Sequence, residues 1–581
     1  MCGIAGYIGN KKASTILTNS IRKLEYRGYD SVGIATINNN QITIKKAKGR
    51  VDQVAKEQDF QSANGNMGIA HSRWATHGKP TDYNSHPFTD HTNRFVLVHN
   101  GIIENYLELK EELRKQNIPF TSDTDSEVIV QLISNKFNGD LLSTVKQVVQ
   151  KLTGAYAICV MDKQKEEIIV ARNGSPLIIG VGQDENFIAS DASAIIEHTK
   201  KVIYLEDFQI ARVTKKTTKI FNYNLDPIQS TIHTIEWDLE QAQKQGYDHF
   251  MLKEIYEQPK VIADSLSINT SIKNDFQRVI FVGCGTASYA GFIGTYLFEK
   301  HLQIPARCEI ASEFRYKNPV IKTTDLIIAI SQSGETADTL AAIRLAKSKG
   351  AKTLGIINVV GSTIAREVDQ VIYSRAGPEI GVASTKAFIS QLMVIYNILN
   401  ELNKENQIDL TNISKIVTQC LNLNDAIKNL AKKYFLSTNF MYIGRDLNFP
   451  LALEGALKLK EISYIHAEGY PAGELKHGPL ALICEETPTL AIATNDPSYE
   501  KTFSNIQEIK ARGGKVISIA TIGDTKIDKI SDDVLYLPKI NSLLNPILTS
   551  IPLQLFAYHI ANLRECDIDK PRNLAKSVTV E

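Results

Sequence analysis

The second residue of the chain brings together two groups that can cleave an amide. Cys2 follows Met1 directly, and removal of Met1 leaves a thiol and a free α-amine on one residue. The thiolate is the nucleophilic form of cysteine, and an unperturbed thiol is mostly protonated at neutral pH. An α-amine titrates at about pH 8, so its neutral fraction can take the thiol proton. Cys2 is therefore a candidate nucleophile that carries its own base; the alternative is a small residue at a disordered terminus.

Four further residues have the chemistry that an amide-cleaving thiol needs. The side chain of Asn100 and the backbone N–H of Gly101 can donate hydrogen bonds to an oxyanion. Arg73 can bind a carboxylate through two hydrogen bonds, and Asp125 can accept from an ammonium group. These two charges suit the α-carboxylate and α-amine of an amino acid. Each residue also has a structural alternative: an ion pair for Arg73, a turn for Asn100–Gly101 and a helix cap for Asp125.

A serine-rich segment farther along the chain suits a phosphate group. Residues 331–336 lie between a predicted strand and a predicted helix, where free backbone N–H groups and the helix dipole favour an anion. The hydroxyls of Ser331, Ser333 and Thr336 add donors. The segment has no lysine of a nucleoside-triphosphate loop, and Gly283-Cys284-Gly285 lacks the third glycine of a dinucleotide fingerprint. An ordinary helix cap is the alternative.

Candidate acid–base groups gather in the last part of the chain. Glu461 lies in a helical pattern, His477 lies in a stretch rich in glycine and proline, and Lys576 lies near the C-terminus. A carboxylate and a histidine in a loop-lined site can move protons, and a desolvated lysine can form a Schiff base with a carbonyl. A solvated helix face and a solvated terminus are the alternatives.

Composition narrows the class of protein. Lys and Arg total 65 and Asp and Glu total 64 in 581 residues, so no global field attracts nucleic acid or an anionic membrane. No run approaches the roughly 20 apolar residues of a membrane span, and we find no signal-peptide pattern. The seven cysteines are scattered without metal-ligand spacing, which argues against a disulfide framework or a metal site. We therefore expect a cytoplasmic protein with several domains.

The order of predicted elements divides the chain. Beyond residue 270, strands alternate with helices, which predicts parallel sheets with both faces covered. A similar order returns about 160 residues later, so we interpret this part as an internal duplication joined by a long helical stretch at 410–433. The second copy lacks the serine-rich segment. We predict the following domains: 1–238, linker 239–270, 271–411, helical connector 412–431, 432–571 and a C-terminal tail at 572–581.

Four N-terminal motifs resemble the class II glutamine amidotransferase domain. They are Cys2-Gly3-Ile4, residues 25–31, residues 71–78 and His99-Asn100-Gly101. The resemblance implies an N-terminal-nucleophile fold with α/β/β/α layers, Cys2 as nucleophile and base, and Asn100 with Gly101 as the oxyanion hole. It implies that Trp74 gates the passage of ammonia. It also implies that glutamine is bound by Arg73, Thr76, His77 and Asp125.

The rest of the chain resembles tandem sugar isomerase (SIS) domains, each a doubly wound parallel sheet. The motifs lie at residues 331–339, 379–386, 453–466, 473–479 and 554–581. The resemblance implies that the sugar phosphate is bound by Ser331, Gln332, Ser333 and Thr336. It implies a sugar site that is lined by Thr286, Val382, Ser384 and Ala575. Ala287 stands where this family has a serine, so a hydroxyl contact is missing or Ser288 supplies it.

The resemblance also implies the roles of three side chains. Glu461 moves a proton between C1 and C2 of the sugar, His477 opens the sugar ring from a neighbouring subunit, and Lys576 forms the Schiff base. The two halves together resemble glutamine-dependent aminotransferases that make glucosamine 6-phosphate and glutamate from fructose 6-phosphate and glutamine. We expect no cofactor, and a homodimer with a composite sugar site. The alternatives are another glutamine amidotransferase, which needs a diphosphosugar loop, and a sugar-phosphate sensor, which needs a basic DNA-binding module.

Overall fold

The computed structural model describes residues 2–235 and 243–579. These form two compact units: residues 2–235 with the tail 575–579, and residues 243–574. The predicted boundary near Trp237 and the start of the predicted linker lie outside the described residues. No helix in the described ranges is long and apolar enough to cross a lipid bilayer.

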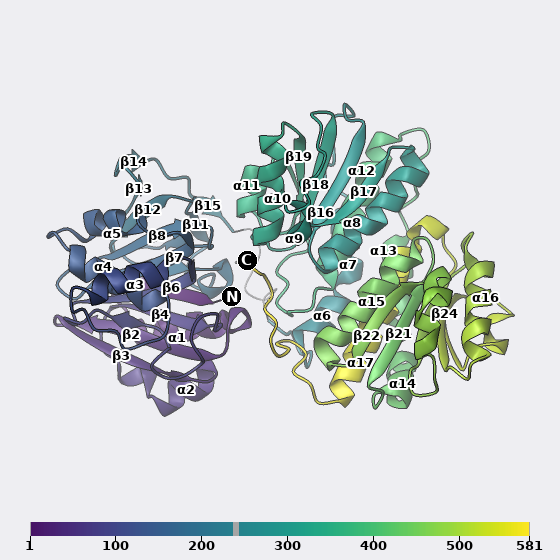
Figure 1. Cartoon of the computed structure of the whole chain (residues 1–581), viewed down its shortest axis with the longest axis horizontal. Coiled ribbons are helices and arrows are strands. Elements are labelled where there is room, and N and C mark those ends of the chain that lie inside the picture. Colours follow the sequence, from purple (N-terminus) through teal and green to yellow (C-terminus); the bar gives the residue numbers. More distant parts are fainter. Residues whose placement is uncertain (1, 236–242, 580–581) are drawn as a thin grey trace. The chain divides into compact units, whose positions relative to one another are not determined.

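The first unit contains two antiparallel sheets (Figure 1). The eight-stranded sheet has the spatial order β15 (His233–Thr234), β11 (Lys201–Tyr204), β9 (Ile178–Val181), β10 (Asn186–Ala189), β1 (Gly3–Ile8), β4 (Met67–Arg73), β2 (Ser31–Asn38) and β3 (Gln41–Lys48). The seven-stranded sheet has the order β14 (Pro227–Ile228), β13 (Thr218–Asn222), β12 (Gln209–Val213), β8 (Ile168–Asn173), β7 (Gly154–Asp162), β6 (Phe95–Ile103) and β5 (Phe88–Thr89). A hydrophobic core that includes Ile4, Ile69 and Val98 joins the two sheets face to face.

Helices cover the outer face of each sheet. The eight-stranded sheet packs against α1 (Ala13–Lys23) and α2 (Val51–Glu57) through a second core. The seven-stranded sheet packs against α3 (Tyr106–Arg114), α4 (Ser126–Lys136) and α5 (Leu141–Val149) through a third. The predicted α/β/β/α layers are thus confirmed, and central strands such as β1, β4 and β7 bury their apolar residues on both faces.

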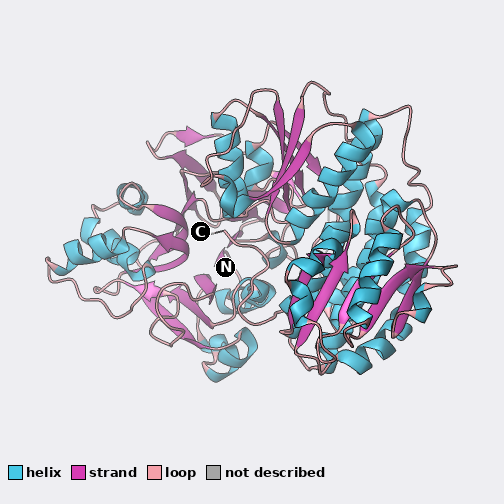
Figure 2. Ribbon diagram, turned by 45° about the vertical axis from the view of Figure 1, so that its right-hand side comes forward, coloured by secondary structure: helices cyan, strands magenta, loops and turns pink. Residues whose placement is uncertain are grey.

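The second unit contains two five-stranded parallel sheets, which Figure 2 shows with helices on both sides. The first has the order β17 (Ala306–Ile310), β16 (Arg278–Gly283), β18 (Asp325–Ser331), β19 (Lys352–Ile357) and β20 (Gln370–Tyr373). The second has the order β22 (His466–Pro471), β21 (Asn439–Gly444), β23 (Thr489–Ala493), β24 (Val516–Thr521) and β25 (Asp533–Leu537). The predicted pair of doubly wound domains is confirmed.

The helices of the second unit cover both faces of each sheet. The first sheet is followed along the chain by α8 (Thr286–Leu297), α9 (Ala311–Phe314), α10 (Ala337–Ser348), α11 (Thr363–Glu367) and α12 (Lys386–Leu402). The second is accompanied by α15 (Asn448–Ser463), α16 (Tyr499–Lys510) and α17 (Asn545–Leu563). In both sheets the second strand in sequence lies on one side of the first, and the third strand lies on the other side. Open α/β sheets bind ligands at such a switch point in strand order.

Local details refine the predicted elements of the second unit. Pro259 lies in the first turn of α7 (Gln258–Ser265), directly after α6 (Phe250–Tyr256) ends, where a missing N–H costs no hydrogen bond. The helical stretch predicted at 410–433 consists of two helices, α13 (Ile413–Leu421) and α14 (Asn424–Tyr434). The stretch rich in glycine and proline before His477 is not all loop, because it begins with the edge strand β22.

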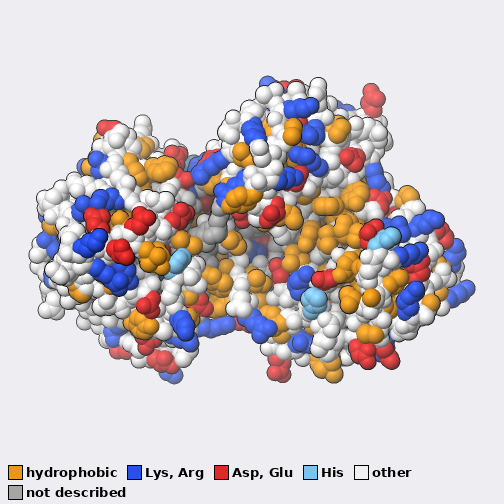
Figure 3. Space-filling view, in the orientation of Figure 1, with side chains coloured by type: hydrophobic (Ala, Val, Ile, Leu, Met, Phe, Trp, Pro, Cys, Tyr) orange, Lys and Arg blue, Asp and Glu red, His pale blue; other side chains and the backbone are white. Residues whose placement is uncertain are grey.

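The visible surface carries mixed charges. Figure 3 shows Lys and Arg side chains interspersed with Asp and Glu on both units. This distribution agrees with the net charge of +1, and it gives no extended field of one sign.

Candidate active sites

Cys2 immediately precedes the central strand of the first unit. Gly3 starts β1, which pairs with β10 on one side and with β4 on the other, and all six residues of β1 are buried. A Cβ at Gly3 would lie 2.7 Å from the Ser72 hydroxyl oxygen, so the strand accepts only glycine there. The interpretation of Cys2 as part of a disordered terminus is therefore wrong.

The thiol of Cys2 lies against the first residue after β4. Its Sγ accepts a hydrogen bond from the Trp74 backbone N–H at 3.2 Å and donates to the Trp74 carbonyl at 3.5 Å. Burial raises the pKa of the Cys2 thiol, while the Trp74 N–H and the positive charge of Arg73 act in the opposite direction. Because burial is the largest effect, the thiol is protonated at neutral pH and needs a base before it can attack.

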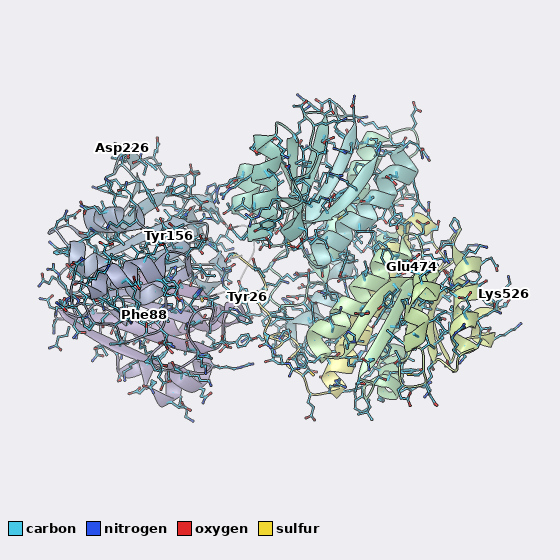
Figure 4. The ribbon with its side chains drawn as sticks, in the orientation of Figure 1. Tyr26, Phe88, Tyr156, Asp226, Glu474 and Lys526 are labelled. Atoms are coloured by element: carbon cyan, nitrogen blue, oxygen red, sulfur yellow. The ribbon has the colours of Figure 1, made fainter. Side chains whose placement is uncertain are left out.

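Asn100 and Gly101 lie inside a strand and not in a turn. Strand β6 pairs with β7 through Ile103, and Gly101 lies opposite Tyr156, which Figure 4 labels. Gly101 has a φ of +132°, and a Cβ there would lie 1.9 Å from the Ala155 carbonyl oxygen. The strand therefore continues through the Asn-Gly pair, with the Asn100 amide donating to the Cys2 carbonyl at 3.0 Å.

Arg73 and Asp125 are buried charged residues near the thiol. Arg73 ends β4, and its guanidinium donates to the carbonyls of His77 and Gly78, the latter at 3.0 Å. Asp125 makes no side-chain cap for α4; its carboxylate accepts from the Ile103 N–H at 2.9 Å. Both charges act on the pKa of the Cys2 thiol, so both lie within electrostatic range of it.

The other residues predicted to bind glutamine follow β4 on the same loop. Trp74 is half-buried and meets the Tyr29 ring edge-on at 5.7 Å. His77 contacts the Tyr106 ring at 5.4 Å between ring centroids, and Thr76 is exposed. The structure thus brings all seven predicted residues of the glutamine site into the segments that surround Cys2.

The serine-rich segment is a tight loop at the switch point of the first parallel sheet. It follows β18, which is adjacent to β16, and Thr286 begins the helix after β16. The Gly334 N–H donates to the Ser331 hydroxyl at 2.9 Å, and Gly334 has a φ of +64°. Together with Gln332, Ser333 and Thr336, this loop presents hydroxyl and backbone donors at the start of α10.

The matching loop of the second sheet contains a carboxylate. Asp496 follows β23, and its side chain accepts from the Asn448 amide at 2.7 Å and from the Thr494 hydroxyl at 3.1 Å. It also accepts from the backbone N–H and the hydroxyl of Ser498, at 2.7 and 2.6 Å. An internal carboxylate therefore accepts from donors at the place that the serine-rich loop occupies in the first copy.

Helix α15 carries a buried charged triad on one face. Lys458 Nζ lies 2.5 Å from Glu461 Oε2 and 3.6 Å from Glu454 Oε1, and Glu454 also accepts from the Thr286 hydroxyl at 3.3 Å. Lys458 and Glu454 are fully buried, so the solvated-face interpretation is wrong for them. Sequence analysis assigned no role to either, although the spacing of 454, 458 and 461 places all three on one helical face.

The triad holds fewer charges than its residue types suggest. Burial, the largest effect, raises the pKa of Glu454 to about 8, and the nearby Glu461 adds to this. The carboxylates of Glu454 and Glu461 raise the pKa of Lys458 despite its burial. At neutral pH, Lys458 is therefore positive and Glu454 is largely protonated.

Val382 and Ser384 lie in the loop before α12. The Val382 N–H donates to the Asp569 carbonyl at 3.1 Å, and the Ser384 hydroxyl donates to Glu379, whose carboxylate also caps α12. Ser288 donates its hydroxyl to the Gly285 carbonyl at 2.6 Å, so its hydrogen is already used within its own turn. Ser288 therefore offers a ligand only an acceptor in place of the hydroxyl donor absent at Ala287.

His477, Ala575 and Lys576 belong to two further segments of the chain. His477 is exposed at the end of a short 3-10 helix, Ala472–His477, in the segment where Figure 4 labels Glu474. Ala575 and Lys576 belong to the first unit, in which the tail residues Ser577 and Thr579 are buried. The placement of Ala575 and Lys576 at the sugar stays a prediction.

Comparisons with known proteins agree with this division. Residues 71–197 match the glutamine amidotransferase domain family, and residues 274–400 and 437–564 each match the SIS domain family. A protein of Aquifex aeolicus named glutamine–fructose-6-phosphate aminotransferase [isomerizing] is 49% identical over 592 residues, covering 100% of both chains. A protein of that name from Thermus thermophilus is 46% identical over 612 residues, again with full coverage.

A solved structure matches the second unit. The C-terminal domain of glucosamine-fructose-6-phosphate aminotransferase from Francisella tularensis is 39% identical, with a TM-score of 0.53. It covers 57% of this chain and 100% of that chain.

The triad makes stability depend on pH. Because the folded-state pKa of Glu454 is raised from 4.5 to about 8, its contribution to stability is full below pH 4.5 and is lost as the pH rises through 8. Glu454→Gln removes this loss, so its stability relative to the parent rises between pH 5 and 8 by up to about 1 kcal/mol per pH unit. Urea denaturation at each pH measures the difference. Exposed Glu405→Gln is the control, and identical pH profiles for Glu454→Gln and the parent would contradict the assignment.

The contribution of Asp496 to the free energy of unfolding can also be tested. Asp496→Ala leaves the donors of Asn448, Thr494 and Ser498 without their acceptor, so we expect a loss of about 1–3 kcal/mol in unfolding free energy. Urea denaturation of the full chain measures it. Exposed Asp528→Ala should change stability by less than about 0.5 kcal/mol. An equal, small effect of both variants would show that Asp496 does not hold the loop.

Proposed function

This chain belongs to the glutamine–fructose-6-phosphate aminotransferase (isomerizing) family, and we propose that its two units perform the two halves of that reaction. The chain transfers the amide nitrogen of glutamine to fructose 6-phosphate and forms glucosamine 6-phosphate and glutamate. The assignment of glutamine hydrolysis to the first unit is supported by the position of Cys2 directly before a central strand. The Asn100 amide donates to the Cys2 backbone carbonyl there. Because the chain is similar to these aminotransferases over its full length, we do not favour a sugar-phosphate sensor or another glutamine amidotransferase.

The first unit hydrolyses glutamine. The α-amine of processed Cys2 takes the thiol proton, and the thiolate attacks the side-chain amide of glutamine. The Asn100 amide and the Gly101 N–H donate to the oxyanion that forms. Collapse of this intermediate gives a glutamyl thioester and ammonia, and water then frees glutamate.

Charged groups orient glutamine for that attack. Arg73 binds its α-carboxylate and Asp125 its α-amine, with Thr76 and His77 at the same loop. Trp74 controls the passage of ammonia. Its position supports this role, because its backbone N–H donates to the Cys2 thiol, where ammonia is released. Ammonia reaches the sugar without release to solvent, where it would be protonated and lost.

The second unit binds and isomerises the sugar. The phosphate is held by the loop residues Ser331, Gln332, Ser333 and Thr336, and the sugar by Thr286, Val382, Ser384 and Ala575. His477 opens the ring and Lys576 forms a Schiff base with the open-chain ketone. Glu461 then moves a proton between C1 and C2, and it is the carboxylate of the triad that is exposed enough for a sugar to reach.

The remaining proposals concern domains, assembly and location. We keep the domain limits 1–238, 271–411 and 432–571, with a tail at 572–581 that completes the sugar site. His477 is exposed in the single chain, which supports a homodimer in which it serves a neighbouring sugar site. All seven cysteines are free thiols, which supports work in the reducing cytoplasm.

Coupled product analysis tests the proposal. With glutamine and fructose 6-phosphate, the parent should release glutamate and glucosamine 6-phosphate in near-equal amounts, and Cys2→Ala should release neither from glutamine. Cys484→Ala, an exposed free thiol, is the matched control and should behave as the parent. Glutamate without amino sugar would leave the glutaminase standing and overturn the acceptor.

The role of Glu461 is tested separately. Glu461→Gln cannot accept the sugar proton, so glucosamine 6-phosphate formation should fall at least about 100-fold while glutamine hydrolysis persists. Both products are measured in one assay. Lys460→Gln, on the exposed side of α15, should leave both rates within about twofold. Unchanged amino-sugar formation by Glu461→Gln would remove Glu461 from proton transfer.

A further inference from the structure

Three buried histidines lie behind the Asn100 amide and have no place in the chemistry above. His71 is on β4, His99 is on β6 and His86 precedes Pro87 in the loop between β4 and β5. His71 Nε2 lies 3.0 Å from Asn100 Oδ1 and 2.9 Å from the His99 carbonyl oxygen. His86 Nδ1 lies 2.9 Å from His71 Nδ1. These contacts form a continuous chain from the loop to the oxyanion hole.

Two backbone carbonyls determine the direction of the hydrogen bonds that reach Asn100. The His99 carbonyl can only accept, so His71 Nε2 carries the hydrogen and also donates to Asn100 Oδ1. His86 Nδ1 lies 2.9 Å from His71 Nδ1 and 3.0 Å from His71 Nε2, and the two rings meet edge to face, so His86 supports His71 by packing against its ring. At the other end the Cys2 carbonyl can only accept, so Asn100 directs its NH2 group toward Cys2. The two ends require the same orientation of the Asn100 amide.

We propose that His71, supported by His86, is a positioning residue that fixes the Asn100 carboxamide with its NH2 group toward the reacting carbonyl. The proposal rests on the oxyanion role of Asn100 proposed above. A flipped amide would present its oxygen to the Cys2 carbonyl and to the oxyanion, and both contacts would be repulsive. His71 prevents the flip, because its only hydrogen near Asn100 points at Oδ1 and would clash with an NH2 group.

The surroundings keep this chain intact over the working range of pH. Burial, the largest effect, lowers the pKa of His71 to about 3, and the charges of Arg73 and His99 act in the same direction. Burial also lowers the pKa of His86, together with His71, Arg73, His99 and Lys46. Both imidazoles are therefore neutral at neutral pH, so the donor and acceptor pattern does not change.

Lys46 supports the outer end of the chain. Its Nζ donates to the carbonyls of Ser85 and Pro87, at 2.6 and 3.0 Å, which flank His86 on both sides. The ammonium group also lies 4.6 Å from the centroid of the Phe88 ring. The position of His86, and through it the position of His71, is thus tied to strand β3.

Substitutions of His71 in the full chain separate positioning from folding. His71→Leu removes the donor, and glutamine hydrolysis should lose kcat by about 10- to 100-fold, a part of what an oxyanion donor supplies, with KM within about threefold. His71→Gln restores an N–H near the Nε2 position and should recover most of kcat. His91→Leu, an exposed histidine, should leave kcat unchanged.

A second readout isolates the oxyanion. Alkylation of Cys2 by iodoacetamide forms no oxyanion, so its rate should be the same in the parent, His71→Leu and His71→Gln. Glucosamine 6-phosphate formation from added ammonium should also be unchanged. The double variant His71→Leu/Asn100→Ala should be no slower than Asn100→Ala, because His71 acts through Asn100.

The outcomes distinguish the two proposals. If Asn100→Ala leaves glutamine hydrolysis intact, the oxyanion role fails and the positioning role fails with it. If Asn100→Ala is slow but His71→Leu is as fast as the parent, only the positioning role is overturned. A slow His71→Leu that is also slow in alkylation, or that adds its full effect to Asn100→Ala, would assign His71 to general stability of the fold.

Discussion

The buried strand β1 is the constraint on which the glutamine site depends. Its six buried residues pair on both sides, so the residue before it cannot move. Cys2 is that residue, and its carbonyl accepts from the Asn100 amide of the facing sheet. The proposed nucleophile and the proposed oxyanion donor are thus held by two sheets whose apolar cores pack together. Cys2 lies close to a chain end, where order is normally lowest, yet it is held because the residues after it belong to the core.

The second unit uses one architecture twice with different contents. Both parallel sheets have the same strand order and the same switch point. In the first copy the loop there offers hydroxyls and N–H groups, while in the second Asp496 satisfies the equivalent donors internally. The two copies therefore offer different groups at the same switch point. The second copy contributes α15 instead, whose Glu454 meets Thr286 of the first copy.

The alternation of strands and helices beyond residue 270 predicted the parallel sheets, whereas the α/β/β/α layers followed from the family resemblance. Local sequence patterns failed where a contact with a residue far along the chain determines the structure. An Asn-Gly pair favours a turn, yet at Asn100 the pairing with β7 carries the strand through it. Helical spacing on α15 puts charges on one face but does not tell which face meets solvent, so the buried Lys458 was missed. The orientation of Asn100 depends on His71, 29 residues away, and no local pattern predicts it.

The two sites handle buried ionisable groups in opposite ways, and each way suits its chemistry. Around Asn100, burial lowers the pKa of His71, so a neutral and directional donor results. Along α15, Lys458 lies nearer to Glu461 than to Glu454, and Glu461 is the more exposed of the two carboxylates. Burial therefore keeps a proton on Glu454, whereas Glu461 is the carboxylate that a substrate can reach. The proposed base is thus the more accessible carboxylate of the triad, as proton abstraction requires.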